Sequence, residues 1–242
     1  MEAIKIEGLT KKYKDVVAVD RLSLAIEEGE LLSLLGVNGA GKTTTIKMLS
    51  CLTAPSAGDA WLLGRSVCKE SAAVKALIAV SPQETAVAAG LSVRENLELI
   101  CGVHGFTREK RSAKIEEMVA LLDLQGVINK KAGKLSGGWQ RRLSIAMALI
   151  SEPRILFLDE PTLGLDVIAR SELWDMIRSL KGKVTIILTT HYMEEAEALS
   201  DRIAIMKDGS LLICDTPDAI KAQTAEDSIE KAFIRIVRGA GR

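Results

Sequence analysis

A glycine-rich segment that ends in lysine and threonine carries the clearest chemical pattern in this sequence. Residues 36–43 read Gly-Val-Asn-Gly-Ala-Gly-Lys-Thr, which fits the spacing GxxxxGK(S/T) of a phosphate-binding loop. Glycines let the backbone curl closely enough for several N–H groups to reach phosphate oxygens together. Lys42 can place a positive charge near the β- and γ-phosphates, and the Thr43 hydroxyl can bind Mg²⁺. An apolar run before the segment and a helical pattern after it favour this interpretation over a glycine turn with a surface lysine.

Two acidic residues follow a second apolar run. Residues 155–158 read Ile-Leu-Phe-Leu and lead directly into Asp159 and Glu160. A buried strand normally excludes carboxylates because their desolvation is expensive without a partner, and Mg²⁺ near Asp159 would be such a partner. Glu160 is expected on the other side of an extended chain, where it could act as general base toward water. The alternative is a strand that ends at a solvated turn, broken by Pro161.

Apolar runs separated by turns predict the strands that would position these residues. We expect strands at 4–7, 22–26, 31–35, 155–158, 185–188 and 203–206. The later strands alternate with helical stretches near 168–180 and 194–199, which is typical of a parallel sheet. Asp208-Gly209 is a hairpin-turn signal between two strand-like runs.

The middle of the chain is predicted to be helical. Ser92 and Glu95 form a capping-box pattern that places a helix start at about Val93. Residues 108–122 have apolar side chains at helical spacing, and 136–150 is apolar enough to be a buried helix. These helices would form a subdomain inserted into the α/β core.

One further motif resembles a known family. Residues 135–140 read Leu-Ser-Gly-Gly-Trp-Gln, which resembles the LSGGQ-type signature of ABC ATPases and lies about one helix upstream of the two acids. Ser136 is expected to cap the following helix, whose free N–H groups attract anions. The resemblance implies that this helix end meets the γ-phosphate held by a second subunit.

Other segments match that family in the same order. Tyr13 resembles the aromatic residue on which adenine stacks, although an ordinary half-buried strand tyrosine is the alternative. Gln83 resembles the Q-loop glutamine, which touches Mg²⁺ and links to the helical subdomain. Residues 163–166 resemble the D-loop. His191 resembles the switch histidine near the γ-phosphate, whereas a histidine without this context would be a packed or surface residue.

The resemblance implies specific roles for these positions, with ATP and Mg²⁺ as ligands. The implied catalytic residues are Glu160, His191, Lys42 and Gln83. The implied nucleotide-binding residues are Tyr13, Gly36, Asn38, Gly39, Ala40, Gly41, Lys42, Thr43, Thr44, Ser136, Gly137 and Gly138. The implied metal ligands are Thr43, Gln83 and Asp159. Three positions depart from the commonest pattern, Val37, Trp139 and Leu163, and Trp139 leaves the details of the signature loop open.

The expected fold is α/β: a P-loop NTPase core with a parallel sheet, an N-terminal antiparallel β subdomain and the inserted helical subdomain. The ATPase domain would span residues 1–222, with its core at 1–85 and 151–222 and the helical subdomain at about 86–150. Residues 223–242 would form a short C-terminal extension. Within it, residues 228–237 are predicted as a short helix or strand with a frayed basic end.

Composition excludes several classes of protein. The 32 basic and 32 acidic residues cancel, so no basic excess supports binding to nucleic acid. No run approaches the roughly 18 apolar residues of a membrane span, and the N-terminus lacks the pattern of a signal peptide. The four cysteines are far apart, which indicates reduced thiols that act as small buried hydrophobes. We therefore expect a cytoplasmic protein, and the resemblance implies that it is attached to the inner face of the membrane through partner subunits.

The sequence favours an ATP-hydrolysing subunit that powers an ABC transporter, with export as the expected direction. The implied partners are a second ATP-binding subunit, as a homodimer, and transmembrane permease subunits. An exposed apolar groove near 84–105 would receive a helix of the membrane partner. A soluble ATPase of an iron–sulfur assembly scaffold and a nucleotide-binding regulator without turnover are the alternatives. The transported substrate stays open.

Overall fold

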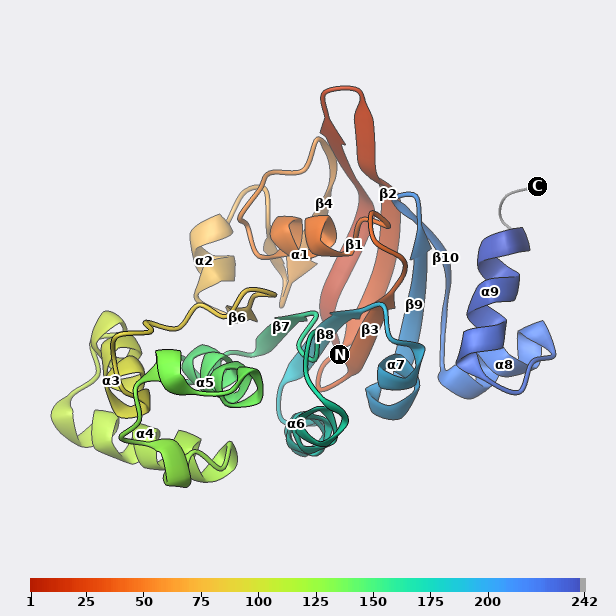
Figure 1. The fold of residues 1–242 in the computed structure, drawn as a ribbon. Coiled ribbons are helices and arrows are strands. Elements are labelled where there is room, and N and C mark those ends of the chain that lie inside the picture. Colours follow the sequence, from red (N-terminus) through yellow and green to blue (C-terminus); the bar gives the residue numbers. More distant parts are fainter. Residues whose placement is uncertain (240–242) are drawn as a thin grey trace.

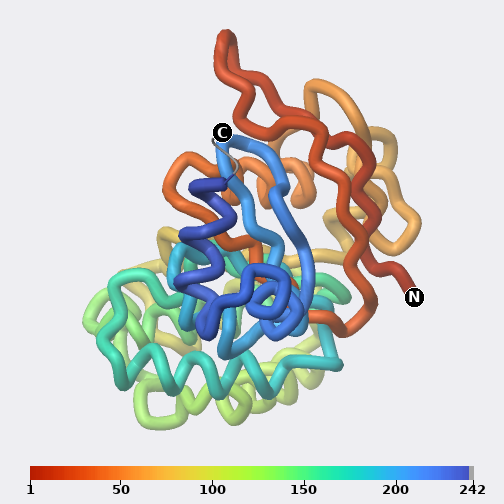
Figure 2. The backbone as a smooth tube through the Cα atoms, turned by 90° about the vertical axis from the view of Figure 1, so that its right-hand side faces the viewer, coloured from red at the N-terminus to blue at the C-terminus, as the bar shows by residue number. Residues whose placement is uncertain are grey.

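Two β-sheets and the helices around them make up the structure, a computed structural model that describes residues 1–239 (Figure 1). The smaller sheet contains β1 (Glu2–Tyr13), β2 (Val16–Glu27), β4 (Ala57–Leu62) and β5 (Arg65–Ser66), in the order β2-β1-β4-β5. Its strand pairs are antiparallel, as predicted for the N-terminal region. Strands β1 and β2 are longer than the predicted 4–7 and 22–26, because they pair with each other over almost their whole length and β1 also pairs with β4. Figure 2 shows their hairpin projecting beyond the rest of the chain.

The larger sheet is the parallel sheet of the core. It contains β3 (Leu31–Leu35), β6 (Ile78–Ser81), β7 (Ile155–Asp159), β8 (Thr185–Thr190), β9 (Arg202–Lys207) and β10 (Ser210–Asp215), in the order β10-β9-β3-β8-β7-β6. All neighbouring pairs are parallel except β9 and β10, which form the predicted hairpin. Its turn residues, Asp208 and Gly209, have φ values of 49° and 80°, as a tight two-residue turn requires.

Burial on both faces explains the continuous apolar runs of the central strands. Every residue of β3, β7 and β8 is buried. Side chains of β7 alternate between the two faces: Leu156 and Leu158 pack with the helical region, whereas Ile155 and Phe157 pack with α1 (Lys42–Leu49) and the smaller sheet. The sheet is therefore a rigid layer from which loops at the strand ends can position a site.

The region between β6 and β7 is helical, as predicted. It contains α3 (Val93–Val103), α4 (Arg108–Leu121) and α5 (Gly137–Leu149), which lie to one side of the sheets in Figure 1. The predicted capping box is present, since Ser92 Oγ accepts from Glu95 N–H and Glu95 accepts from Ser92 N–H. The three helices share one apolar cluster with α6 (Val167–Leu180) and one face of the larger sheet.

The C-terminal helices cover the outer part of the larger sheet. Helix α9 (Ile229–Gly239) packs against α7 (Met193–Leu199) and α8 (Pro217–Thr224) through Ile229, Ala232 and Phe233. Figure 2 shows α9 in front of β9 and β10. A helix is thus the outcome for residues 229–237 of the predicted segment 228–237, while the end of the chain after residue 239 lies outside the described residues. Short helix α2 (Ser71–Lys75) precedes β6.

Two expectations about the surface have clear outcomes. None of the helices within residues 1–239 combines the length and the apolar character that crossing a membrane requires. The four cysteines are free, but they are not all buried: Cys101 is buried, Cys51 and Cys214 are half-buried, and Cys68 is exposed. The prediction was wrong for Cys68 because this residue follows the edge strand β5, at the surface of the smaller sheet.

Candidate nucleotide-binding and hydrolysis site

Four strands of the larger sheet end at the site. The phosphate loop (residues 36–43) follows β3, Gln83 lies just after β6, Asp159 ends β7, and His191 follows β8. Since these strands are parallel, their carboxyl ends meet at one edge of the sheet. A cavity of about 620 Å³ lies there. The predicted residues that line it are Tyr13, Asn38, Gly39, Ala40, Gly41, Lys42, Thr43, Thr44, Gln83, Glu160 and His191.

Some predicted residues do not line this cavity. Within residues 1–239, Gly36, Asp159 and the signature residues Ser136, Gly137 and Gly138 are outside its wall. Gly36 has a packing role instead, because a Cβ on it would come within 2.6 Å of the Met206 carbonyl oxygen. Sequence reasoning assigned no role to Val16, Val17, Ala18 or Asp208, which the β1–β2 and β9–β10 hairpins bring to the wall.

Left-handed glycines shape the phosphate loop. Gly39 and Gly41 have φ values of 85° and 100°, which residues with a side chain rarely adopt. At Gly41 a Cβ would also come within 2.5 Å of the Ala18 carbonyl oxygen, so only glycine fits. Helix α1 begins at Lys42, so the first turn of the helix lies at the cavity, and the free N–H groups of a helix N-terminus attract anions.

The Lys42 ammonium group lies inside the phosphate loop. Its Nζ donates to the Gly36 carbonyl oxygen at 2.7 Å and to that of Val37 at 3.3 Å. Glu160 Oε1 lies 3.4 Å from the same Nζ, and both side chains are buried. A buried cation surrounded by carbonyl oxygens and one carboxylate is fixed in place, as a group that binds phosphate must be.

Asp159 and Thr43 form an oxygen cluster beside the loop. Asp159 Oδ1 accepts hydrogen bonds from Thr43 Oγ1 at 3.2 Å and from Thr189 Oγ1 at 2.5 Å. Mg²⁺ prefers oxygen ligands and is usually held by one or two carboxylates together with substrate phosphates. The Asp159 carboxylate, the Thr43 hydroxyl and the side-chain amide of Gln83, which lines the same cavity as Thr43, therefore fit Mg²⁺ by the chemistry of their donors.

Glu160 does not continue the extended strand. Its φ is 49°, in the left-handed region, so the expectation that it points away from Asp159 along an extended chain was wrong. The turn brings the Glu160 side chain to the cavity wall, while its N–H donates to the Thr189 carbonyl oxygen and hydroxyl.

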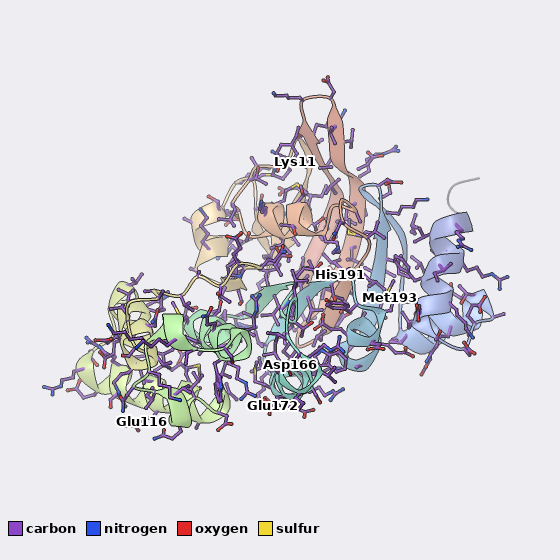
Figure 3. The ribbon with its side chains drawn as sticks, in the orientation of Figure 1. Lys11, Glu116, Asp166, Glu172, His191 and Met193 are labelled. Carbon is purple, nitrogen blue, oxygen red and sulfur yellow. The ribbon has the colours of Figure 1, made fainter. Side chains whose placement is uncertain are left out.

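His191 contacts the other oxygen of the same carboxylate. Its Nδ1 lies 2.7 Å from Glu160 Oε2, and the Tyr192 ring packs against the imidazole at a centroid distance of 4.1 Å. Figure 3 shows His191 close to Met193, at the start of α7, and far from Glu116 on α4. Glu160 is thus held between an ammonium group and an imidazole, which leaves its carboxylate in one orientation.

Tyr13 lies at the end of β1, beside the β1–β2 turn. Its side chain is 45% exposed, so the ring is more open than that of an ordinary half-buried strand tyrosine. Lys11 Nζ lies 5.0 Å from the ring centroid. The ring therefore has surface available for stacking with an aromatic base.

The signature residues lie at the start of α5, in an exposed loop. Ser136 is the residue before the helix, but its side chain makes no capping hydrogen bond, contrary to the prediction. Gln140 holds this loop instead, because its Nε2 donates to the Ala132 and Leu135 carbonyl oxygens at 3.2 Å. Trp139 packs toward the helical region, with the Arg142 guanidinium 4.8 Å from its ring centroid. The exposed face of the loop thus consists of Ser136 and Gly137.

A buried glutamate near the site has no counterpart in the sequence predictions. Glu195, on α7, is fully buried, and its Oε1 accepts from Trp174 Nε1 at 3.1 Å. Its Oε2 has no hydrogen-bond partner among residues 1–239. Burial is the main reason why the pKa of Glu195 is raised above its ordinary value of 4.5. The sequence gives no signal for this burial, because a glutamate in the first turn of a short helix is usually exposed.

This raised pKa makes Glu195→Gln a stabilising change at neutral and higher pH. Above pH 4.5 the unfolded chain releases the Glu195 proton, whereas the folded chain keeps it. The contribution of Glu195 to the free energy of unfolding is therefore complete below pH 4.5 and is lost as pH rises through the pKa of the folded state. Glutamine has the same shape without a charge. Thermal unfolding of both proteins should be measured between about pH 5 and about pH 8. The variant should become more stable relative to the unchanged protein as pH rises.

The neighbouring residue provides the control for that experiment. Glu194 has a side chain that is 81% exposed, so Glu194→Gln should follow the pH profile of the unchanged protein. Parallel profiles for the unchanged protein and the Glu195→Gln variant would contradict a raised pKa at Glu195.

Comparison with known proteins agrees with this geometry. The sequence model of the family described as "ABC transporter" matches residues 19–163. The daunorubicin resistance ATP-binding protein DrrA3 of Streptomyces coeruleorubidus is 41% identical over 241 residues, covering 99% of this chain and 75% of the relative. The Nod factor export ATP-binding protein I of Burkholderia pseudomallei is 40% identical, covering 94% and 75%. The probable multidrug ABC transporter ATP-binding protein YbhF of Escherichia coli is 38% identical over 97% of this chain, which spans 41% of that relative.

Two solved structures have the same fold. A structure described as the ATP-binding subunit of an ABC transporter has a TM-score of 0.85 at 24% identity, covering 97% of this chain and 99% of its own. The dimeric post-hydrolysis structure of the ATP-binding cassette MJ0796 with ADP and Pi has a TM-score of 0.79 at 27% identity, covering 88% and 98%. The α/β fold with an antiparallel β subdomain is thereby confirmed. On its sequence, its fold and the composition of its site, this chain belongs to the ABC transporter family, as one of its ATP-binding subunits.

Proposed function

We propose that two copies of this chain bind two ATP molecules between them and that closure of the dimer powers export through a membrane partner. One observation carries the proposal: the catalytic residues line one cavity, whereas Ser136 and Gly137 are exposed on a different surface of the same chain. A site that needs both groups is incomplete in one subunit. A head-to-tail pair with two-fold symmetry completes two sites at once.

Binding in this proposal rests on the loop and its lysine. The N–H groups of residues 39–43 and the Lys42 ammonium bind phosphate oxygens, while the Tyr13 ring stacks with adenine. Thr43, Asp159 and Gln83 would hold Mg²⁺, which when bound offsets the charge on the phosphates. The exposed signature loop would contact the γ-phosphate bound by the other subunit.

Hydrolysis needs a base, and Glu160 is placed to act as one. Its carboxylate accepts a proton from the attacking water, and the Lys42 and His191 contacts keep it oriented. His191 and Lys42 donate toward the charge that develops on the transferred phosphoryl group. The roles of Thr43, Gln83 and Asp159 are to keep the phosphates positioned for in-line attack.

Transport is the use of this cycle that the relatives support. Their names refer to daunorubicin resistance, multidrug transport and Nod factor export, which favours an exporter over an assembly scaffold. Leu99 and Val103, one helical turn apart on α3, are 48% and 74% exposed and offer an apolar surface to transmembrane permease subunits. In this proposal the protein acts at the cytoplasmic face of the membrane through those subunits.

The same proposal divides the chain into three functional regions. Residues 1–85 and 151–222 form the ATP-binding core, about 86–150 form the helical subdomain that carries the signature loop, and 223–242 form the extension. The apolar side chains that α3, α4 and α5 share hold these helices together and support their movement as one body.

Mixed dimers test the sharing of sites between subunits. One arrangement places Lys42→Met on one subunit and Ser136→Arg on the other; the second places both changes on one subunit opposite an unchanged one. If sites are shared, the first arrangement keeps one intact site and the second keeps none. We expect about one occluded ATP per dimer in the first and none in the second, measured after rapid removal of free nucleotide. The reverse pattern would show that each subunit builds its site alone.

The membrane partner is tested by purification from the native cell in mild detergent, followed by mass spectrometry. We expect a polytopic membrane protein to accompany the tagged chain. The Leu99→Asp/Val103→Asp double variant should lose that partner while retaining ATP binding, because it changes only an exposed apolar surface. Recovery of soluble partners alone would contradict the transporter function and favour an assembly scaffold.

A further inference from the structure

A buried arginine connects the signature helix to the backbone at Gln83. Arg141, on α5, donates from Nη1 to the Pro82 carbonyl oxygen and from Nη2 to the Gln83 carbonyl oxygen, each at 2.6 Å. The planar guanidinium therefore binds two successive peptide groups with one fork. Lysine, with one ammonium group, cannot reproduce this arrangement.

Arg141 is not an ordinary surface arginine. It is only 4% exposed, and a guanidinium withdrawn from water is expensive to bury unless its donors are satisfied. Burial lowers the pKa of this guanidinium, and the charges of Asp159 and Glu195 oppose that shift. The two bonds to the 82–83 backbone offset part of the cost of burying this charge.

Flanking bonds extend this contact in both directions along α5. One turn further along the helix, Ser144 Oγ lies 3.0 Å from Ser81 Oγ, at the end of β6. On the other side, Thr85 Oγ1 donates to Gln140 Oε1 at 3.5 Å. We call this row of contacts between residues 81–85 and 140–144 the seam. Because Gln140 also holds the signature loop, the seam runs continuously from Gln83 to that loop.

The two ends of the seam serve different ATP sites in the proposed dimer. Gln83 lines the cavity of its own subunit, whereas the signature loop is exposed for the partner subunit's nucleotide. We propose that Arg141 is a positioning residue that makes Gln83 and the signature loop of one subunit move as a single body, and so couples the two ATP sites. This inference rests on the proposed function, since it needs two shared sites.

The next residue along the helix is a matched control. Arg142 is also buried, at 9% exposure, but it pairs with Glu172 at 2.6 Å and stacks on Trp139. Within residues 1–239 it makes no hydrogen bond or ion pair with residues 82–85; its bonds go to the helical region and α6. Arg142→Lys and Arg141→Lys thus make the same chemical change at neighbouring buried positions, and only the second breaks the seam.

The test measures cooperativity and ATP affinity on the full chain. For Arg141→Lys we expect the maximal hydrolysis rate to fall about 10- to 100-fold and the Hill coefficient for ATP to fall to about 1. The ATP dissociation constant of the single subunit should change less than about 2-fold, because the phosphate loop is untouched. Arg142→Lys should keep the cooperativity of the unchanged protein. Ser144→Ala, which weakens the seam at another point, should lower the Hill coefficient by a smaller amount.

A double variant separates positioning from general damage. If Arg141 acts through Gln83, adding Arg141→Lys to Gln83→Ala should slow hydrolysis no further than Gln83→Ala alone. The inference would be overturned if the two substitutions slowed hydrolysis by factors that multiply in the double variant. It would also be overturned if Arg141→Lys lost thermal stability and ATP affinity along with its hydrolysis rate. If Arg141→Lys does not fold, the Hill coefficient of Ser144→Ala decides the case. A Hill coefficient of about 1 for the protein without substitutions would instead contradict the proposed coupling of two shared sites. This measurement comes first, so it is distinguishable from a failure of the Arg141 inference.

Discussion

Replacing Glu160 by glutamine is expected to slow ATP hydrolysis by about 10²- to 10⁴-fold while ATP still binds. The amide has the size of the carboxylate but cannot accept the proton of the attacking water. Its oxygen can keep the contact with Lys42, now 3.4 Å from Oε1, and its NH₂ group can donate to His191 Nδ1. The cavity therefore keeps its shape while it loses its base. Phosphate release at saturating ATP and direct measurement of ATP affinity separate these two effects.

Removal of the proton acceptor also predicts an accumulation of ATP-bound dimer. When hydrolysis is slow, ATP stays bound and the closed dimer does not dissociate. Size-exclusion chromatography should therefore show more dimer with ATP than with ADP. Glu194→Gln removes the same charge from an exposed side chain and should leave both measurements unchanged. A Glu160→Gln protein with the turnover rate of the unchanged chain would eliminate Glu160 as the base.

Replacing Lys42 by methionine should weaken ATP binding by about 10- to 100-fold, because a hydrogen bond to a charged group contributes about 1.5–3 kcal/mol. The ammonium group lies within the phosphate loop, with the Gly36 carbonyl oxygen 2.7 Å away, so a bound phosphate has only to replace one of its present partners. Its loss also leaves the buried Glu160 carboxylate with one partner fewer. Hydrolysis should therefore fall by a larger factor than binding. Titration with a fluorescent ATP analogue and a steady-state hydrolysis assay measure the two quantities.

Lys47 provides the matched control on the same helix. It lies in the last turn of α1 and is exposed, so Lys47→Met removes the same charge from α1 without changing the phosphate loop. Equal ATP affinities for the two methionine variants would show that Lys42 does not contact phosphate. Lys42→Arg should restore little activity, because a planar guanidinium cannot replace a compact ammonium within these carbonyl distances.

The local patterns of the sequence predicted most elements of the core and of the helical region. The capping box at Ser92 and Glu95 marks the start of α3, and the Asp208-Gly209 pair marks the β9–β10 turn. In both cases the interacting groups lie within three residues of one another, so the chain segment itself contains the information. The short predictions for β1 and β2 failed for the opposite reason. The length of β1 depends partly on pairing with β4, which is distant along the chain, and the length of β2 depends on pairing with β1.

Two predictions at the site disagree with the structure. Glu160 was predicted from strand geometry, but its backbone turns, and its N–H bonds to Thr189 on the neighbouring strand. Ser136 was predicted to cap α5, but its side chain makes no capping bond, and Gln140 one turn further along donates to the carbonyl oxygens of the loop instead. In both cases the local rule did not describe the contacts that the folded chain makes.

By itself, the sequence determined the chemical groups of the site: the glycines and lysine of the phosphate loop, the acids after β7 and the histidine after β8. Those residues are set by spacing along the chain, and parallel strands bring their ends to one edge. Only the tertiary structure decided how the groups meet. The 2.7 Å contact of His191 with Glu160, the burial of Glu195 and the fork of Arg141 on the 82–83 backbone each join distant segments. Such contacts depend on packing between layers, and no local pattern in the chain encodes which segments will be pressed together.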